Sequence, residues 1–103
     1  MTSPTARSLA KLRKEGWLAE VVEKWNHITK TRKDLWGFAD ILAIREGEVL
    51  AVQATSYSNV SSRVKKITEH ENLDMVRKSG VGIEVWGWHK VGRFWQVRIV
   101  DCS

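Results

Sequence analysis

Two polar side chains interrupt apolar segments at a spacing that could build a metal site. Asp40 stands near the start of the run FADILAI, and Gln53 stands thirteen residues later in the run VLAVQAT. A carboxylate and an amide oxygen held side by side can share a hard divalent cation, because such cations prefer oxygen ligands. A cation held there can carry the water that attacks a phosphodiester. Asp40 and Gln53 therefore form a candidate Mg²⁺ or Mn²⁺ site.

These two residues meet only if the chain between them forms a β-hairpin. The tetrapeptide Arg45-Glu46-Gly47-Glu48 separates two β-rich runs, which is typical of a hairpin with a short Gly-containing turn. A turn at residues 45–48 pairs positions whose numbers sum to roughly 93, so Asp40 and Gln53 fall opposite each other. Both runs are almost continuously apolar, which predicts central strands covered on both faces.

A hydroxyl-rich segment follows the proposed site and leads into a helix. Its side chains with a candidate role in binding phosphate are Thr55, Ser56, Ser58, Asn59 and Ser62. Hydroxyls and free N–H groups at a helix N-terminus suit an oxyanion. We expect this segment either to hold a phosphate beside the cleaved one or to act only as a Ser-rich helix cap.

Residues 59–79 show helical periodicity, with Asn59 suited to the N-cap and Gly80 to the end. The apolar stripe expected to face the core contains Val60, Val64, Ile67 and Met75. Basic side chains lie beside this stripe, namely Arg63, Lys65 and Lys66. They could approach a phosphate group, although an ordinary solvated helix face carries the same residue types.

The rest of the chain predicts one further helix and three further strands. Ser3-Pro4 suits the start of the helix and Gly16 its end. The strand-like segments are residues 17–25, GIEVWGWHK and RFWQVRIV, with a polar basic connection at residues 26–37 and a turn near Gly92. The expected order is α-β-β-β-α-β-β, an α/β fold in one domain (1–103) with a central mixed sheet flanked by helices.

Composition limits the classes of function. The 103 residues are 43% hydrophobic and 28% charged, which is typical of one folded domain. The net charge of +5 favours a polyanionic partner such as nucleic acid. No apolar stretch reaches the roughly 20 residues that span a bilayer, and the N-terminus shows no signal-peptide pattern. With Cys102 as the single cysteine, we expect a reducing cytoplasmic location and no membrane contact.

Tryptophan is unusually frequent, with six in the chain. Large rings can fill a thin core or stack on exposed bases. Most of the six lie in strand-like segments and are expected in the core, whereas Trp36, in a Gly-containing loop, is expected to contact nucleic acid. The histidines show no metal-ligand spacing, and His70 is expected in mid-helix, exposed to solvent.

The hairpin and the element order resemble the PD-(D/E)XK nuclease superfamily, which has the restriction-endonuclease-like fold and includes archaeal Holliday-junction resolvases and VRR-type nucleases. The segment GFADILAI-REGE-VLAVQATS looks like that family's G-x-x-D…E-x-K hairpin. More narrowly, DLWGFADILAI, VQATSYSNVSSRVKKITEH and IEVWGWHK look like small phage and prophage proteins. The resemblance implies a metal-dependent DNA endonuclease or junction-resolving enzyme, whose substrate could be branched DNA. It also implies a bacterial or phage protein that acts in the cytoplasm, and it suggests a homodimer.

The chain departs from the family pattern at two positions. Gln53 stands where the family usually has Glu, and Thr55 stands where it usually has Lys. A neutral amide weakens binding of Mg²⁺, and a threonine cannot stabilise developing phosphate charge as a lysine can. Relatives with a displaced basic residue imply Arg63 or Lys66, on the following helix, as its replacement.

The resemblance also implies additional acidic ligands. Asp34, in the loop before the hairpin, is the candidate extra metal ligand. Several relatives carry a glutamate on the first helix; Glu15 lies at the wrong end of that helix here, and Glu20, on the first strand, is the better match.

Two alternatives to an enzyme stay open. The chain could have the nuclease fold and only bind nucleic acid, its catalysis lost with the family's Glu and Lys. It could also be a phage accessory protein that binds a protein partner, with the tryptophans as interface anchors.

Overall fold

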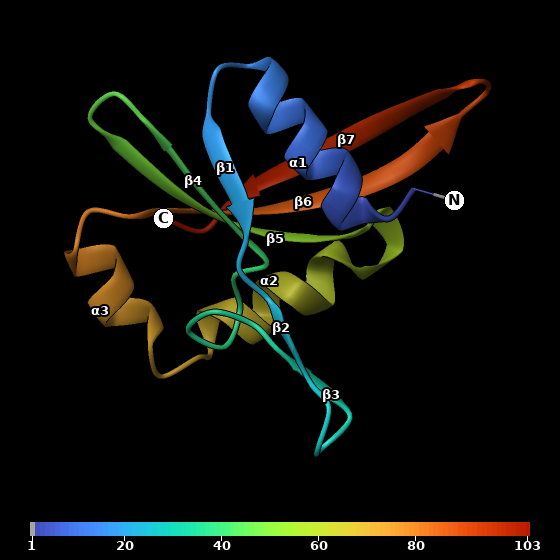
Figure 1. Ribbon diagram of the computed structural model, residues 1–103. Coiled ribbons are helices and arrows are strands. Elements are labelled where there is room, and N and C mark those ends of the chain that lie inside the picture. Colours follow the sequence, from blue (N-terminus) through green and yellow to red (C-terminus); the bar gives the residue numbers. More distant parts are fainter. Residues whose placement is uncertain (1) are drawn as a thin grey trace.

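The computed structural model describes residues 2–103, which form a five-stranded mixed β-sheet between helices (Figure 1). Helix α1 (Pro4–Lys14) covers one face, and α2 (Val60–Thr68) and α3 (Leu73–Lys78) cover the other. The strands lie in the order β1-β4-β5-β6-β7, with bounds β1 Leu18–Val21, β4 Ile41–Arg45, β5 Glu48–Ser56, β6 Gly82–Val91 and β7 Phe94–Asp101. The predicted α/β class is therefore confirmed.

Each face of the sheet buries its own apolar cluster. On the α1 side, Leu12 packs with side chains that include Ile41, Val52 and Trp86. On the other side, Ile67 and its helical neighbours pack with Ala51, and the single cysteine, Cys102, is buried among them. Ala51 and Val52 are adjacent on β5 and face opposite clusters, which explains why that strand is continuously apolar.

The predicted hairpin has the expected register. Strands β4 and β5 are antiparallel, with Ile41 opposite Val52 and Arg45 opposite Glu48. Strand β6 then runs parallel to β5 after the helical crossover, and β7 returns antiparallel to β6. Because β5 and β6 are parallel, their carboxyl ends lie at the same edge of the sheet. The start of α1 lies at this edge as well (Figure 1).

The prediction of one strand over residues 17–25 followed by a loop over 26–37 is wrong. The chain leaves the main sheet after β1 and forms a separate two-stranded sheet from β2 (Lys24–Asn26) and β3 (Thr31–Lys33). All side chains of residues 24–33 are exposed, so this hairpin carries no apolar face by which alternation could reveal it.

The prediction of one helix over residues 59–79 is also wrong. A 3₁₀ turn, η1 (Tyr57–Asn59), precedes α2, and residues 69–72 form a turn before α3. The Asn72 N–H donates to His70 Nδ1 across this turn, at 3.0 Å. The turn changes the buried side of the following helix, so Met75 is 69% exposed while Leu73 and Val76 are buried.

None of the helices within residues 2–103 is long and apolar enough to cross a bilayer. The two longest of them, α1 and α2, span eleven and nine residues, and a bilayer core requires about 20.

Candidate metal site

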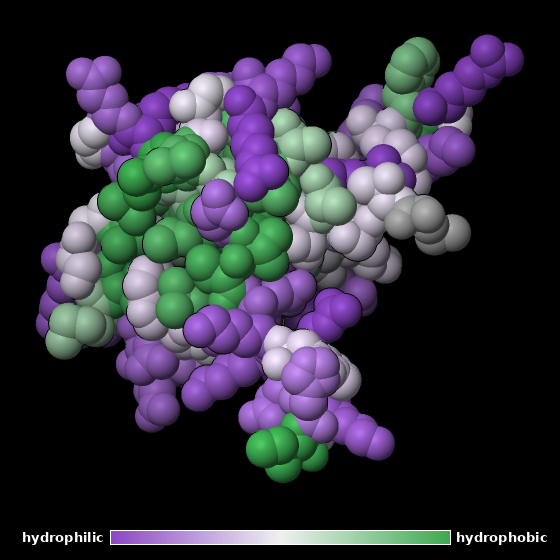
Figure 2. All heavy atoms as spheres, in the orientation of Figure 1, coloured by the Kyte–Doolittle hydropathy of each residue, from purple (hydrophilic) through white to green (hydrophobic). Residues whose placement is uncertain are grey.

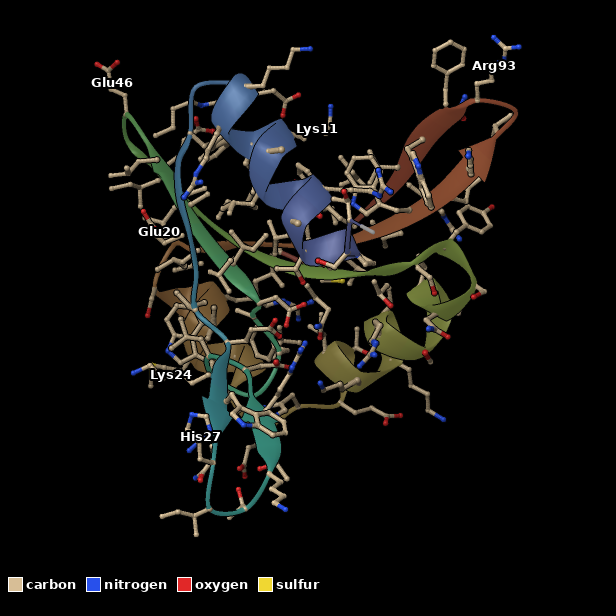
Figure 3. The ribbon with its side chains drawn as sticks, turned by 45° about the vertical axis from the view of Figure 1, so that its right-hand side comes forward. Lys11, Glu20, Lys24, His27, Glu46 and Arg93 are labelled. Carbon is tan, nitrogen blue, oxygen red and sulfur yellow. The ribbon has the colours of Figure 1, made fainter. Side chains whose placement is uncertain are left out.

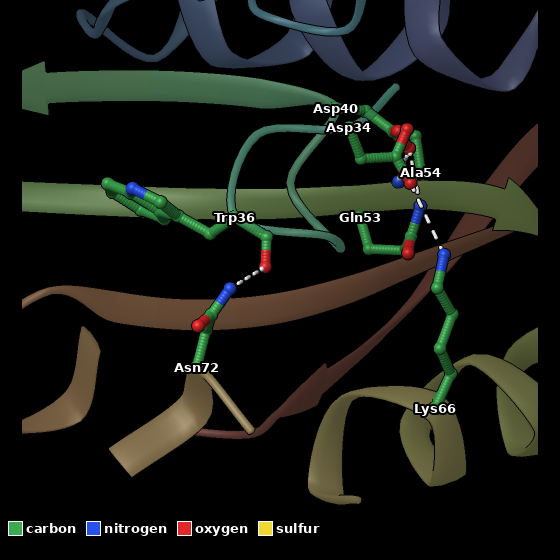
Figure 4. Close-up of polar contacts among 7 residues, drawn as sticks. All are labelled: Asp34, Trp36, Asp40, Gln53, Ala54, Lys66 and Asn72. Carbon is green, nitrogen blue, oxygen red and sulfur yellow. Dashed lines mark hydrogen bonds and ion pairs between the residues drawn. The ribbon is translucent and has the colours of Figure 1, made fainter. Parts of the chain in front are cut away.

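Asp40 is held by backbone bonds on both sides. Its N–H donates to the carbonyl of Val52 on β5, at 2.9 Å, and its carbonyl accepts from the N–H of Val22 at the end of β1, at 2.8 Å. Its carboxylate accepts from the Ala54 N–H at 2.9 Å and from Gln53 Nε2 at 2.8 Å (Figure 4). The predicted pairing of Asp40 with Gln53 is therefore confirmed.

A tight loop brings Asp34 back toward Asp40. Leu35 and Ala39 exchange backbone hydrogen bonds of 2.9 Å, and the loop bends through Trp36 and Gly37 with positive φ values of 58° and 91°. A Cβ at position 37 would collide with His70 Nε2, so glycine is required for His70 to pack there. His70 is thus half-buried in the turn between α2 and α3, against the Phe38 ring, and the expectation of an exposed mid-helix residue is wrong.

Three carboxylates gather where these segments meet. One oxygen from each of Glu23, Asp34 and Asp40 lies within 4.8 Å of the others. Oxygen ligands about 2.1 to 2.4 Å from one cation have separations of this order. Glu23 was not predicted as a site residue, because residues 17–25 were expected to form one strand. The chain instead turns away from the main sheet between β1 and β2, where Glu23 lies.

The electrostatics of the cluster act on Asp40. Burial, with a smaller contribution from the neighbouring Asp34, raises the pKa of the Asp40 carboxyl from 3.8 to about 7, against the lowering effect of the hydrogen bonds from Ala54 and Gln53. A bound cation would favour the ionised form, so binding there releases a proton.

Gln53 places an unpartnered oxygen in the buried part of the site. Its side chain is 4% exposed, and Gln53 Oε1 has no hydrogen-bond partner among the described residues. The amide nitrogen, rather than the oxygen, faces Asp40 in this structure. A half-turn of the amide exchanges the two atoms and directs the oxygen at the carboxylates, which is the arrangement that a metal ligand needs.

Two cations flank the three carboxylates. Lys66 Nζ reaches from α2 to Asp34 Oδ2 at 3.3 Å (Figure 4), and Arg32 Nη1 lies 3.6 Å from Glu23 Oε1. Of the two basic residues predicted as a replacement for the family's lysine, Lys66 pairs with Asp34 and Arg63 lines the cleft. The cluster opens into a cleft of about 800 Å³ that is also lined by the start of α1.

The structure divides the remaining candidates into two groups. The cleft is lined by Thr55, Ser56, Asn59 and Arg63. The residues outside its lining are Trp36, Ser58, Ser62 and Lys65. Ser56 Oγ accepts from Asn59 Nδ2 at 3.1 Å, so the predicted N-cap side chain turns back to the cleft rather than capping α2.

Trp36 was expected to be the tryptophan outside the core, but it is half-buried. Its ring packs against the α2 side of the core, and its carbonyl accepts from Asn72 Nδ2 at 2.9 Å, away from the carboxylates (Figure 4). The tryptophans with large exposure are instead Trp25, at 50%, and Trp95, at 43%.

Glu20 and Glu15 lie outside the cluster. Glu20 is exposed on β1, 3.6 Å from Arg13 Nη2, and points away from the base of the β2–β3 hairpin (Figure 3). Glu15 forms an ion pair with Lys11 at the far end of α1. The third carboxylate of the cluster is Glu23, three positions beyond the better of the two expected matches.

Comparisons of the chain with models of protein families, with curated proteins and with solved structures give no match. Function is consequently inferred from the geometry and chemistry of the site.

Proposed function

We propose that this protein is a metal-dependent nuclease that hydrolyses phosphodiester bonds in DNA. The observation that carries the proposal is the meeting of Glu23, Asp34 and Asp40 in an open cleft on a basic domain. Its proposed location is the bacterial cytoplasm, where DNA is accessible.

The residues fit a hard divalent cation. Carboxylate and amide oxygens are the ligands that Mg²⁺ and Mn²⁺ prefer, and the buried Gln53 Oε1 lacks any other partner among the described residues. Glu23, Asp34 and Asp40 would hold the ion, with Gln53 as a fourth ligand after its amide turns. When bound, the ion supplies Lewis-acid stabilisation of phosphate charge and a water with a lowered pKa.

Other side chains of the cleft serve the phosphate. Arg63 lines the cleft and offers a guanidinium to the developing negative charge, the role that Thr55 cannot perform. The hydroxyl of Ser56 and the amide of Asn59 line the same cleft and can hold the neighbouring phosphate. Lys66, on α2, balances the charge of Asp34.

A second function is favoured by one observation. The Gln53 amide donates to Asp40, and this bond stabilises the carboxylate without any metal. A protein with that arrangement could bind nucleic acid without cleaving it, so an assay must separate turnover from binding.

The test is a cleavage assay on linear, nicked and branched DNA in Mn²⁺. Asp40→Asn and Glu23→Gln each remove one carboxylate of the cluster, and we expect each to lower the cleavage rate by at least about 100-fold. Glu20→Gln is the matched control, because it makes the same change three residues away on an exposed side chain. Its rate should equal that of the wild type.

Two outcomes decide against turnover by this site. Cleavage that Asp40→Asn leaves unchanged would show that the activity comes from elsewhere. If the wild type binds DNA without cutting it and Gln53→Glu creates cleavage, the native protein is a binding module with a nuclease-like site.

A further inference from the structure

The β2–β3 hairpin, residues 24–33 and hereafter the arm, projects from the body of the protein (Figure 1). Every side chain of the arm is exposed. Its sequence, KWNHITKTRK, contains four Lys or Arg residues and no Asp or Glu. The arm therefore carries a net charge of +4, counted from these residues, out of +5 for the whole chain.

The base of the arm is part of the metal site. Glu23 directly precedes β2 and Asp34 directly follows β3, so the two strands rise from two of the three clustered carboxylates. Arg32, near the base, pairs with Glu23 at 3.6 Å and lines the cleft. Anything that follows the arm toward its base reaches the cleft.

The tip is ordered and carries an aliphatic side chain. Asn26 Oδ1 accepts the N–H groups of Ile28 at 2.9 Å and Thr29 at 3.2 Å, which fixes the turn. Ile28 is 93% exposed. Figure 2 shows the arm as a hydrophilic projection that ends in a hydrophobic group, and Ile28 is the aliphatic residue of that turn.

The arm contributes little to stability of the fold and contains repulsion of its own. Lys24 lies directly opposite Lys33 in the ladder, and like charges placed this way are destabilising. A two-stranded hairpin without a buried face is marginal in water. A bound polyanion would neutralise the repulsion, since phosphates attract lysines and release their counterions.

We propose that the arm grips DNA beside the phosphate that is cleaved. Lys24, Lys30 and Lys33 contact the sugar-phosphate backbone, and Ile28 contacts the sugars or bases at the outer end. The occupant is DNA rather than an acidic protein because the arm leads into a carboxylate cluster that suits phosphodiester chemistry, so the inference rests on the proposed function for the identity of its ligand.

The test measures binding of a fluorescent DNA duplex in chelator, where cleavage does not interfere. The variant Lys24→Gln/Lys30→Gln/Lys33→Gln should bind at least about 10-fold more weakly, with a log-affinity against log-salt slope that falls by about 0.9 for each phosphate that the arm no longer neutralises. The variant Lys11→Gln/Lys14→Gln/Lys78→Gln removes the same charge from α1 and α3, and Lys11 lies at the opposite end of the molecule from the arm (Figure 3). Its affinity should change by less than about 3-fold.

A second variant separates the tip from the lysines. Ile28→Ser keeps the charge of the arm, and we expect an affinity loss of up to about 10-fold without a change in the salt slope. All these side chains are exposed or form only surface ion pairs, and equal melting temperatures would confirm that every variant is folded.

The outcomes distinguish this inference from the proposed function. Equal losses of affinity in the arm and control variants would overturn the proposal that the arm binds DNA. The absence of any affinity of the wild type for duplex or single-stranded DNA at low salt would also overturn it, and would make an acidic protein the better occupant. Arm-dependent binding without cleavage in Mn²⁺ upholds the arm as a DNA grip and overturns the nuclease. Cleavage and DNA affinity that are both unchanged in the arm variants would uphold the nuclease and overturn the role of the arm.

Discussion

Two β-hairpins meet at the carboxylate cluster, and they are built in opposite ways. Strands β4 and β5 form the centre of the sheet, where Ile41 and Val52 face each other with no exposed surface. The arm pairs Lys24 with Lys33 and exposes every side chain. The first hairpin fixes Asp40 through bonds to both neighbouring strands, whereas the second brings Glu23 and Asp34 to the same place from its two ends.

The difference separates two requirements of a site that handles a charged polymer. Ligands for a small ion must be held to within a fraction of an ångström, which requires a rigid, packed support. Contacts with a flexible polyanion need reach and charge, which an exposed hairpin supplies. Under the proposed function, joining the two at one cluster would place the DNA beside the ligands of the ion.

Matched isoleucine substitutions give the largest expected contrast between the hairpins. Ile41→Ala removes a fully buried side chain from β4 and should lower the free energy of unfolding by about 2–5 kcal/mol. Ile28→Ala changes a 93% exposed side chain at the tip of the arm and should stay within about 0.5 kcal/mol of the wild type. Urea unfolding measures both, and a large loss from Ile28→Ala would show that the arm packs on the body in solution.

Asp40→Asn tests the electrostatic cost of burying a carboxyl in the central hairpin. The pKa of Asp40 rises from 3.8 to about 7 on folding, chiefly through burial. Between these values the folded protein holds a proton that the unfolded chain has lost, so raising the pH lowers the free energy of unfolding. An asparagine has no such proton. Relative to the wild type, Asp40→Asn should therefore gain between about 2 and 4 kcal/mol from about pH 4 to about pH 8.

The measurement for Asp40→Asn is urea unfolding in chelator at both pH values. A stability difference between the variant and the wild type that stays constant with pH would contradict the raised pKa. Repeating the series with Mn²⁺ at about pH 8 should raise the stability of the wild type relative to Asp40→Asn, because a metal held by the cluster would stabilise only the protein that keeps its ligand.

The contrast also explains what the sequence could predict. The β4–β5 hairpin, its register and the Asp40–Gln53 contact follow from two apolar runs and a Gly-containing turn, since burial leaves its mark on residue type. The arm has no buried residue, so the residue types of β2 and β3 gave no pattern from which the strands could be predicted. The position of Glu23 at the base of the arm could therefore not be predicted either. At the break between α2 and α3, His70 packs close to Gly37, a contact between distant segments that periodicity cannot encode.

Substitutions in the two turns give the smallest expected contrast. Gly47, in the β4–β5 turn, has a φ of +74°, and a Cβ added there would meet only open space, so Gly47→Ala costs only backbone strain. We expect a loss of about 1 kcal/mol in the free energy of unfolding. Lys30, in the turn of the arm, has a φ of +53°, and Lys30→Gly relieves the same kind of strain.

The relief from Lys30→Gly should nevertheless leave global unfolding unchanged. A hairpin held only by its own ladder opens without unfolding the sheet, so its local stability does not add to the global transition. Urea unfolding should therefore report Gly47→Ala and miss Lys30→Gly, whereas hydrogen exchange of the arm amides should slow in Lys30→Gly. If Lys30→Gly shifts the urea midpoint as much as Gly47→Ala does, the arm unfolds together with the sheet, and the separation of a rigid support from an independent arm fails.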